Sequence, residues 1–313
     1  MKWPFKRITK EPGWLAIRLL PDALHLVHGQ YQSGGAPVID WCGAHALEGE
    51  FAGADRMAKE LELQRYQCST LLLTGEYQLL QVDAPNVPQL ELKTAVRWRI
   101  KDMLDYHADD ATIDVLAVPS AGAANERGAS MYAVAARNDV IQSCIKRFET
   151  ARIALTVIDI PELAQRNVAS LYEPEGRGVA MLYVDQDQSL LTVNFRHELL
   201  MSRRIEAGAR ELGPDAGAAR DDGRQRVLLE LQRTFDHLDR QFAYAPVGKL
   251  MLAPEQQDSG LLEFLGANLD LPVERASLGG SIAFGARAEM APADEWRMFH
   301  LIGASLRNEE KAL

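Results

Sequence analysis

The sequence is poor in cysteine and has no long apolar segment. Only three of its 313 residues are cysteines, and they lie far apart, at Cys42, Cys68 and Cys144. An odd number at such spacings provides neither a disulfide framework nor a metal-binding pattern, and it favours free thiols in a reducing compartment. The longest apolar runs, such as residues 179–184, are far shorter than the roughly 18–20 residues of a membrane span. We therefore expect a cytoplasmic protein without a transmembrane helix or a metal.

Basic residues are outnumbered by acidic ones. The 34 lysines and arginines face 44 aspartates and glutamates, which gives a net charge of −10. This balance argues against a general nucleic-acid-binding protein, whose surface must be basic. The sequence also lacks a nucleophile-elbow or Walker A motif. The adjacent carboxylates Asp109-Asp110 and Asp221-Asp222 lie in expected loops and are typical of caps or turns rather than of an acid–base pair.

The first ten residues are basic and partly apolar. Trp3 and Phe5 alternate with Lys2, Lys6 and Arg7. The segment lacks the apolar core of a secretory signal. Its pattern is that of a short anchor on a membrane surface, and it is equally that of a solvated chain terminus. These five residues are the candidate membrane-surface contact.

The apolar residues that are present, 47% of the chain, follow an order of elements that occurs twice. The first series is strands over 14–20, 23–28 and 38–43, a helix over 55–64 and a strand over 69–73. The second series is strands over 179–184, 190–195 and 197–205, a helix over 224–244 and a strand over 249–252. Residues 206–224 are rich in Gly, Ala, Asp and Arg. We expect them to form a mobile loop between the third strand and the helix of the second series.

Residues 78–152 interrupt the first series and predict a β-α-β-β-α insert. Its helix begins near Gln89, and Leu92, Val96 and Ile100 form the apolar stripe that it buries. We expect the first lobe over 1–178, with this insert, the second lobe over 179–290, and a C-terminal helix over 291–313 that packs back on the first lobe. Two series of this kind indicate an α/β fold of the actin-like, ribonuclease-H-like type, with two lobes.

Two helices carry a more specific resemblance. The run Ala95-Val96-Arg97-Trp98 resembles the A-[IV]-R-W-E pattern of the PilM family, and residues 228–237 are similar to the helix before that family's adenosine loop. The order of elements agrees along nearly the whole chain, and the MshI-type subgroup of mannose-sensitive haemagglutinin pilus systems is the most similar. The cytoplasmic domain of GspL, from type II secretion, shares the fold but continues into a membrane span.

The resemblance implies a nucleotide site, and this sequence departs from it at the first phosphate loop. The family has a hairpin with D-x-G and a following lysine at this point. Here Arg18 stands for the aspartate, Leu20 for the glycine and His25 for the lysine. Pro21 also removes an amide donor. We expect this loop to bind phosphate poorly, because only glycine lets the backbone amides approach an anion closely.

The other two nucleotide loops depart from the family as well. In the second phosphate loop Asp185 is retained and could hold a hydrated Mg²⁺, whereas Asp187 places a negative charge where glycine belongs. The adenosine loop has lost its glycines and contains Ala253 and Glu255. These residues are the candidate degenerate nucleotide site, and we expect no cofactor there.

The resemblance implies a non-enzymatic scaffold at the cytoplasmic face of the inner membrane. Such a protein captures the N-terminal tail of a PilN-type single-span partner in a groove between the first lobe and its insert, and it belongs to the assembly platform that also includes the pilus ATPase. The candidate groove residues are Arg97, Trp98, Arg99 and Lys101, since Trp and Arg often dominate peptide binding. Alternatively, Trp98 packs in the core of the insert.

Two other functions use the same fold. The first is an ATP-binding protein that cycles between open and closed lobes in pilus or type II secretion assembly. The second is a divergent sugar or acetate kinase. Both require intact phosphate loops, so the substitutions at Arg18, Leu20 and Asp187 argue against both.

Overall fold

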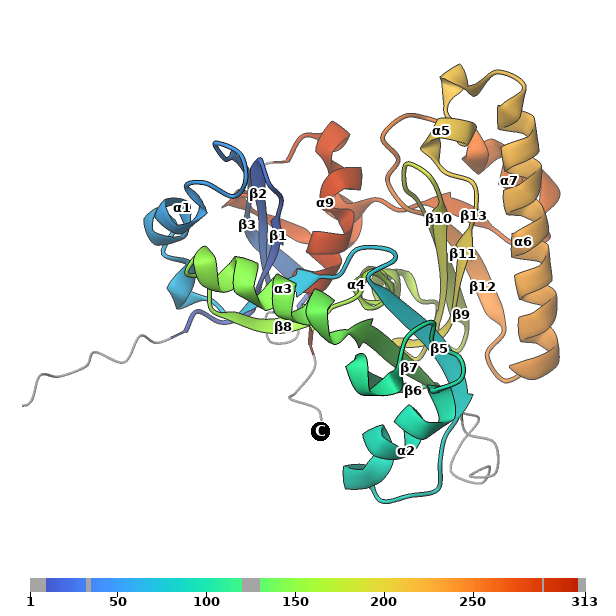
Figure 1. The fold of residues 1–313 in the computed structure, drawn as a ribbon. Coiled ribbons are helices and arrows are strands. Elements are labelled where there is room, and N and C mark those ends of the chain that lie inside the picture. Colours follow the sequence, from blue (N-terminus) through green and yellow to red (C-terminus); the bar gives the residue numbers. More distant parts are fainter. Residues whose placement is uncertain (1–9, 32–34, 120–129, 289, 309–313) are drawn as a thin grey trace, which may run out of the picture.

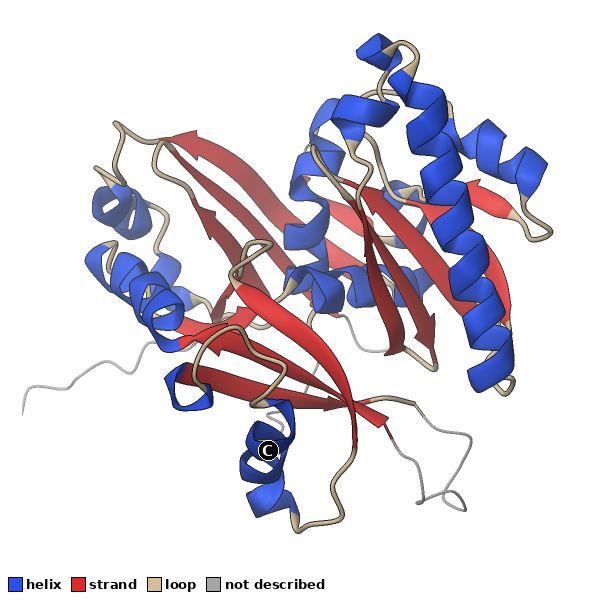
Figure 2. Cartoon of the chain, turned by 45° about the vertical axis from the view of Figure 1, so that its right-hand side comes forward, coloured by secondary structure: helices blue, strands red, loops and turns tan. Residues whose placement is uncertain are grey.

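The computed structural model describes residues 10–31, 35–119, 130–288 and 290–308. In this part of the chain, two mixed β-sheets lie on either side of a pair of helices (Figure 1). A third, smaller sheet belongs to the insert and is seen below the other two in Figure 2. None of the described helices is both long and apolar enough to cross a bilayer.

The first sheet has the strand order β14-β3-β2-β1-β4-β8. Its strands are β1 (Trp14–Leu19), β2 (Ala23–Tyr31), β3 (Pro37–Ala46), β4 (Cys68–Leu71), β8 (Leu155–Asp159) and β14 (Ala283–Arg287). The antiparallel β1–β2 hairpin turns at Pro21-Asp22, as the sequence predicts, and β4 and β8 run parallel to β1. The edge strand β14 was not expected, because its five residues are mostly exposed and show no apolar alternation.

The second sheet repeats this arrangement with the order β11-β10-β9-β12-β13. Its strands are β9 (Gly178–Val184), β10 (Ser189–Phe195), β11 (Glu198–Ile205), β12 (Val247–Leu252) and β13 (Val273–Arg275). Strands β9 and β10 are buried at every position, because helices or the insert cover both of their faces. The two expected series of strands are therefore confirmed.

Two helices occupy the space between the sheets. Helix α9 (Pro292–Ser305) packs on β1 and β2 of the first sheet, and α4 (Pro161–Ala169) packs on β9 and β10 of the second. The two helices also contact each other, and this contact continues the core from one sheet to the other. Figure 1 shows α9 between the two groups of strands.

The outer face of the second sheet is covered by the long helix α6 (Ala219–Gln241). The prediction of a mobile loop over 206–224 is wrong. Residues of that segment form α5 (Ala209–Leu212), a 3-10 turn η5 (Pro214–Ala216) and the first turns of α6. Three of the glycines in this segment, Gly208, Gly213 and Gly223, have close neighbours, and Gly223 lies within α6 against Leu212. Gly217 instead adopts a positive φ of 58°.

The remaining elements are short. The helices are α1 (Ala54–Glu60), α7 (Leu261–Asn268) and α8 (Leu278–Ser281). The 3-10 helices are η1 (Leu63–Arg65), η2 (Gln89–Glu91), η3 (Ala108–Asp110) and η4 (Ser170–Tyr172).

The insert is an antiparallel sheet of order β5-β7-β6 with one helix on it. It contains β5 (Tyr77–Asp83), α2 (Leu92–Ile100), β6 (Ala111–Ala117) and β7 (Ser130–Arg137). One face of the sheet buries Val96 and Ile100 of α2, and the other places Tyr132 in the core of the second sheet. Helix α3 (Asn138–Thr150), assigned to the insert from the sequence, instead packs Cys144 and Phe148 into the core of the first sheet.

Candidate functional site

A cleft of about 790 Å³ opens between the two lobes. It brings together five of the residues that the sequence assigns to the degenerate nucleotide site, namely Arg18, Leu20, His25, Asp185 and Asp187. The β1–β2 hairpin forms one wall and the turn between β9 and β10 forms the opposite wall. The two segments that the sequence compares with phosphate loops therefore line opposite walls of one cleft.

On the first wall, Arg18 and His25 are paired directly across the β1–β2 hairpin. Their side chains therefore lie on the same face of the sheet. Arg18 is half-buried and forms no ion pair with any described residue. His25 is buried, and its Nδ1 atom has no hydrogen-bond partner. Burial, with a further contribution from Arg18, lowers the pKa of His25, so the imidazole is neutral beside the guanidinium at pH 7.

On the second wall, the turn of residues 185–188 is fixed by α5. The backbone N–H groups of Ala209 and Arg210 donate to the carbonyls of Asp185 at 2.7 Å and of Gln186 at 3.1 Å. The Arg210 guanidinium donates to the Asp187 carboxylate. The Asp185 and Asp187 side chains are exposed, so an anion that approaches this turn meets two carboxylates.

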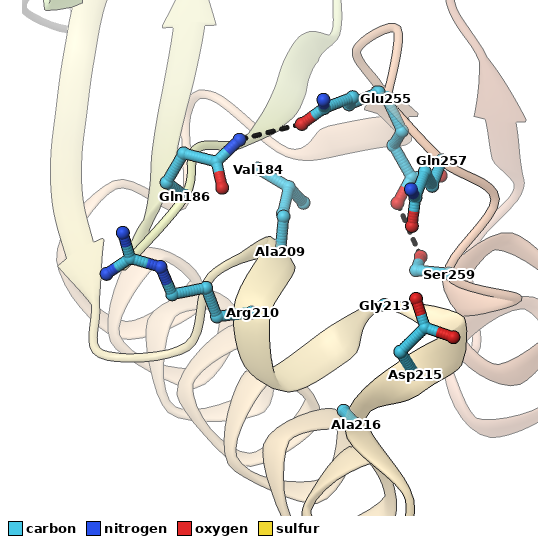
Figure 3. Close-up of a pocket in the computed structure, with 11 residues that line it drawn as sticks. Val184, Gln186, Ala209, Arg210, Gly213, Asp215, Ala216, Glu255, Gln257 and Ser259 are labelled. Atoms are coloured by element: carbon cyan, nitrogen blue, oxygen red, sulfur yellow. Dashed lines mark hydrogen bonds between the residues drawn. The ribbon is translucent and has the colours of Figure 1, made fainter.

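The adenosine-loop residues lie outside this cleft. Ala253 is buried at the end of β12, and Glu255 lines a neighbouring cavity of about 290 Å³ (Figure 3). The Ser259 hydroxyl donates to the Glu255 carboxylate, and Arg275 lies 3.1 Å from it. Burial raises the pKa of Glu255, while Ser259 and Arg275 oppose that rise. The Glu255 carboxylate is therefore held by two polar side chains at the wall of this cavity.

A hydrogen bond connects the second wall of the cleft to the altered adenosine loop. Gln186 lines both the cleft and the smaller cavity. Its Nε2 atom donates to Oε1 of Gln256, a residue that lines the smaller cavity, at 2.7 Å. Figure 3 shows this bond at Gln186 as a dashed line.

The sequence analysis missed the polar network at the base of the cleft. Glu162 of α4 is buried, and it accepts hydrogen bonds from the Tyr77 hydroxyl and, at 2.7 Å, from Arg204 of β11. Arg204 also donates to Thr74 at 2.8 Å. Burial is the main cause that raises the pKa of Tyr77, so its hydroxyl remains a neutral donor. The network joins α4, the insert and the second sheet, and no sequence spacing indicates it.

Helix α9 supplies a third wall that the sequence analysis also missed. Trp296, Arg297 and His300 line the cleft. The His300 ring lies 4.3 Å from the ring of Tyr183, and its Nε2 atom is 3.3 Å from Oε1 of Gln165. Burial, followed by Arg18 and Arg204, lowers the pKa of His300 to about 3. The spacing of four residues between 296 and 300 was a usable signal, since it places both on one face of the helix.

The four candidate groove residues lie on α2 or directly after it. Trp98 is 68% exposed, which excludes the alternative that it packs in the core of the insert. The Lys101 ammonium is 5.5 Å from the centre of the Trp98 ring, Arg97 donates to the Ala108 carbonyl, and Arg99 is exposed.

A cavity of about 580 Å³ lies beside this surface. Arg97, Trp98 and Lys101 line it together with residues from 102–109. The cavity is therefore formed within the insert and not, as expected, between the insert and the first lobe. The candidate membrane-surface residues Lys2, Trp3, Phe5, Lys6 and Arg7 lie outside the described residues. Among the side chains that the structure describes, no group of three or more His, Cys, Asp or Glu residues could hold a metal ion.

Comparisons with known proteins give structural matches only. No protein-family model matches the sequence, and no curated protein matches it. A solved structure of the "PilM-PilN type IV pilus biogenesis complex" matches with a TM-score of 0.69 and 18% identity, over 94% of this chain and 98% of that chain. The cytoplasmic domain of EpsL, an inner-membrane component of the type II secretion system of Vibrio cholerae, matches with a TM-score of 0.48 and 13% identity, over 95% and 96%.

A Bacteroides thetaiotaomicron protein with an actin-like ATPase fold and unknown function matches with a TM-score of 0.49 and 8% identity, over 96% and 99% of the two chains. The likeness to the PilM-PilN structure shows the fold. The chain thus has the α/β, two-lobed, actin-like fold that the order of its strands predicts.

Proposed function

We propose that this chain is a non-enzymatic scaffold of a type IV pilus assembly platform of the MshI type. It acts on the cytoplasmic face of the inner membrane and binds the cytoplasmic tail of a PilN-type single-span protein. The pilus assembly ATPase is a further partner, and the basic N-terminal residues contact lipid. The observation that carries the proposal is the structural match to the PilM-PilN complex over 94% of this chain, a share that includes most of the insert.

The geometry of the cleft supports a scaffold rather than an ATPase. Leu20 and Pro21 occupy the turn where an anion would need free backbone amides, and Asp187 brings a carboxylate to the opposite turn. Glu255 lines the neighbouring cavity, and Gln186 forms a hydrogen bond at its wall. A fold can persist after its catalytic site has been lost, because function depends on the site.

The surface around Trp98 supports peptide binding. An indole that is 68% exposed provides a large apolar contact at little cost in conformational entropy. The exposed cations Arg99 and Lys101 beside it can bind carboxylates or backbone carbonyls of an extended tail. Side chains of these types commonly dominate the binding energy of an interface.

Calorimetry of the purified chain with a synthetic peptide of the partner's N-terminal tail tests this proposal. We expect saturable binding that Trp98→Ala weakens about tenfold or more. Leu229→Ala is the matched control, because Leu229 is a half-exposed apolar residue on α6, in the other lobe. The absence of heat at high micromolar peptide, or equal losses in the two variants, would contradict the proposal.

The alternative is an ATP-binding protein whose lobes open and close during pilus or type II secretion assembly. Two observations favour it: the cleft has the volume of a ligand pocket, and Asp185 is retained at its wall. It differs from the scaffold in requiring Mg²⁺ and nucleotide, and a thermal-shift measurement distinguishes the two.

A further inference from the structure

Two opposite charges face the same cleft from different lobes. Arg18 belongs to β1 of the first sheet, and Asp185 lies at the end of β9 in the second. Within the described residues neither side chain forms an ion pair; Asp185 only accepts a local hydrogen bond from the N–H of Gln186. A half-buried guanidinium without a counter-ion is costly, so a carboxylate that reached it would be stabilised.

The other charged groups around the cleft are already engaged. Arg204 is paired with Glu162 at 2.7 Å, Asp187 with Arg210, and Arg297 lies 3.8 Å from Asp294. The remaining carboxylate, Asp22, lies in the turn of the same hairpin as Arg18. Asp185 is therefore the one unpaired carboxylate among the described lining residues that approaches Arg18 from the opposite wall.

Tyr183 lines the cleft together with Arg18 and Asp185. Burial is the largest cause that raises the pKa of Tyr183. Asp185 raises this pKa further, and Arg18 lowers it. The Tyr183 hydroxyl donates to the carbonyl of Trp296 at 3.1 Å, so it is fixed at the junction of the second sheet with α9. Arg18 and Asp185 therefore line the same cleft as this fixed hydroxyl, and the described residues include no ion pair between them.

The base of the cleft is closed and its mouth is open. At the base, Glu162 binds both Tyr77 and Arg204, and Tyr132 donates to the Leu200 carbonyl at 3.3 Å. The mouth is formed by two hairpin turns that no described hydrogen bond connects to each other. Relative motion of the lobes would therefore change the distance between these turns more than the contacts at the base.

We propose that the lobes close on a direct Arg18–Asp185 ion pair, so that the protein supplies its own bridge across the cleft. Closure of the lobes by this ion pair needs neither a nucleotide nor a metal ion. An external oxyanion is a weaker competitor for Arg18, because it must pass the exposed carboxylates of Asp22 and Asp187. Asp185, being part of the chain, is present at a high effective concentration.

Charge reversal tests whether the Arg18–Asp185 ion pair closes the lobes. The variants are Arg18→Asp, Asp185→Arg and the double variant that exchanges the two charges. Spin labels on cysteines at Arg56 of α1 and Asp222 of α6, in a chain with Cys42 replaced by serine, report the distance between the lobes by pulsed electron resonance. Thermal melts establish that each variant folds, and Asp185→Asn provides a milder second test.

We expect a shorter-distance population that increases at low ionic strength and decreases about fivefold or more in each single variant. The double variant restores it, and Asp22→Asn, the matched control on the same wall, leaves it unchanged. Distance distributions that are identical in the wild type and the single variants would overturn the proposal. A population that inorganic phosphate induces but the exchanged charges do not restore would overturn it as well.

Discussion

Gly303 of α9 lies against Ala164 of α4 so closely that a Cβ atom on Gly303 would be only 2.0 Å from the Ala164 carbonyl oxygen. The Gly303 carbonyl in turn accepts a hydrogen bond of 2.9 Å from Asn167. These contacts hold together the two helices that lie between the sheets. The spacing of the lobes, and hence the shape of the cleft, depends on this contact.

Substitution of Gly303 is therefore expected to destabilise the protein. Gly303→Val should lower the free energy of unfolding by about 2–3 kcal/mol, because the backbone of α4 must move to admit the side chain. Urea denaturation measures the loss. The control is Gly266→Ala in α7, where no atom lies within 4 Å of the added methyl group, and it should be neutral or slightly stabilising. Equal effects would contradict the packing argument.

The network at the base of the cleft predicts an asymmetry between buried and exposed ion pairs. Arg204→Ala leaves the carboxylate of Glu162, whose side chain is 2% exposed, without its cation. We expect a loss of about 3 kcal/mol or more in unfolding free energy. Arg56→Ala breaks a pair in which both side chains are exposed, and it should cost less than about 1 kcal/mol. If chemical denaturation gave similar losses for Arg204→Ala and Arg56→Ala, the network would not stabilise the contact of α4, the insert and the second sheet.

Burial of His300 predicts a loss of stability in acid. Its pKa is about 3 in the folded protein and about 6.5 in the unfolded chain, so the unfolded chain takes up the proton first as the pH falls. Above pH 6.5 the protonation of His300 does not lower the free energy of unfolding. Between pH 6.5 and pH 3 this free energy falls by about 1.4 kcal/mol for each pH unit. Urea denaturation between pH 7 and 4.5 measures this slope.

The variant His300→Gln removes the titrating group and should flatten the slope by about 2–3 kcal/mol over that pH range. Gly266→Ala, which changes no titrating group, should leave the slope unchanged. A slope in His300→Gln equal to that of the wild type would show that His300 is not the group responsible.

The sequence predicted the sheets better than the site. Alternating apolar residues located β1, β2 and the all-buried strands of the second sheet, and the two hairpins place Arg18 and Asp185 at one cleft. The sequence could not predict the wall supplied by α9, because that depends on packing between residues more than a hundred positions apart. The composition of residues 206–224 led to a wrong prediction of a loop. Gly208 and Gly223 instead make close contacts with Asp187 and Leu212.

Nucleotide should not stabilise the protein. A ligand that binds only the folded state, at one hundred times its dissociation constant, adds about 2.7 kcal/mol and raises the melting temperature. On the proposed function, Leu20, Asp187 and Glu255 replace groups that would bind a nucleotide, so we expect no shift with millimolar ATP and Mg²⁺. Differential scanning fluorimetry makes the measurement. A rise of several degrees that requires both ATP and Mg²⁺ would favour the ATP-binding alternative.

The central claim is that the chain binds its membrane partner as a scaffold, without nucleotide. The most direct measurement is the affinity of the full chain for the partner's N-terminal tail peptide, determined by calorimetry in EDTA and again with ATP and Mg²⁺. The scaffold predicts the same dissociation constant in both conditions and a weaker one for Trp98→Ala in both. Binding that occurs only with ATP and Mg²⁺, or no binding in either condition, would contradict the claim.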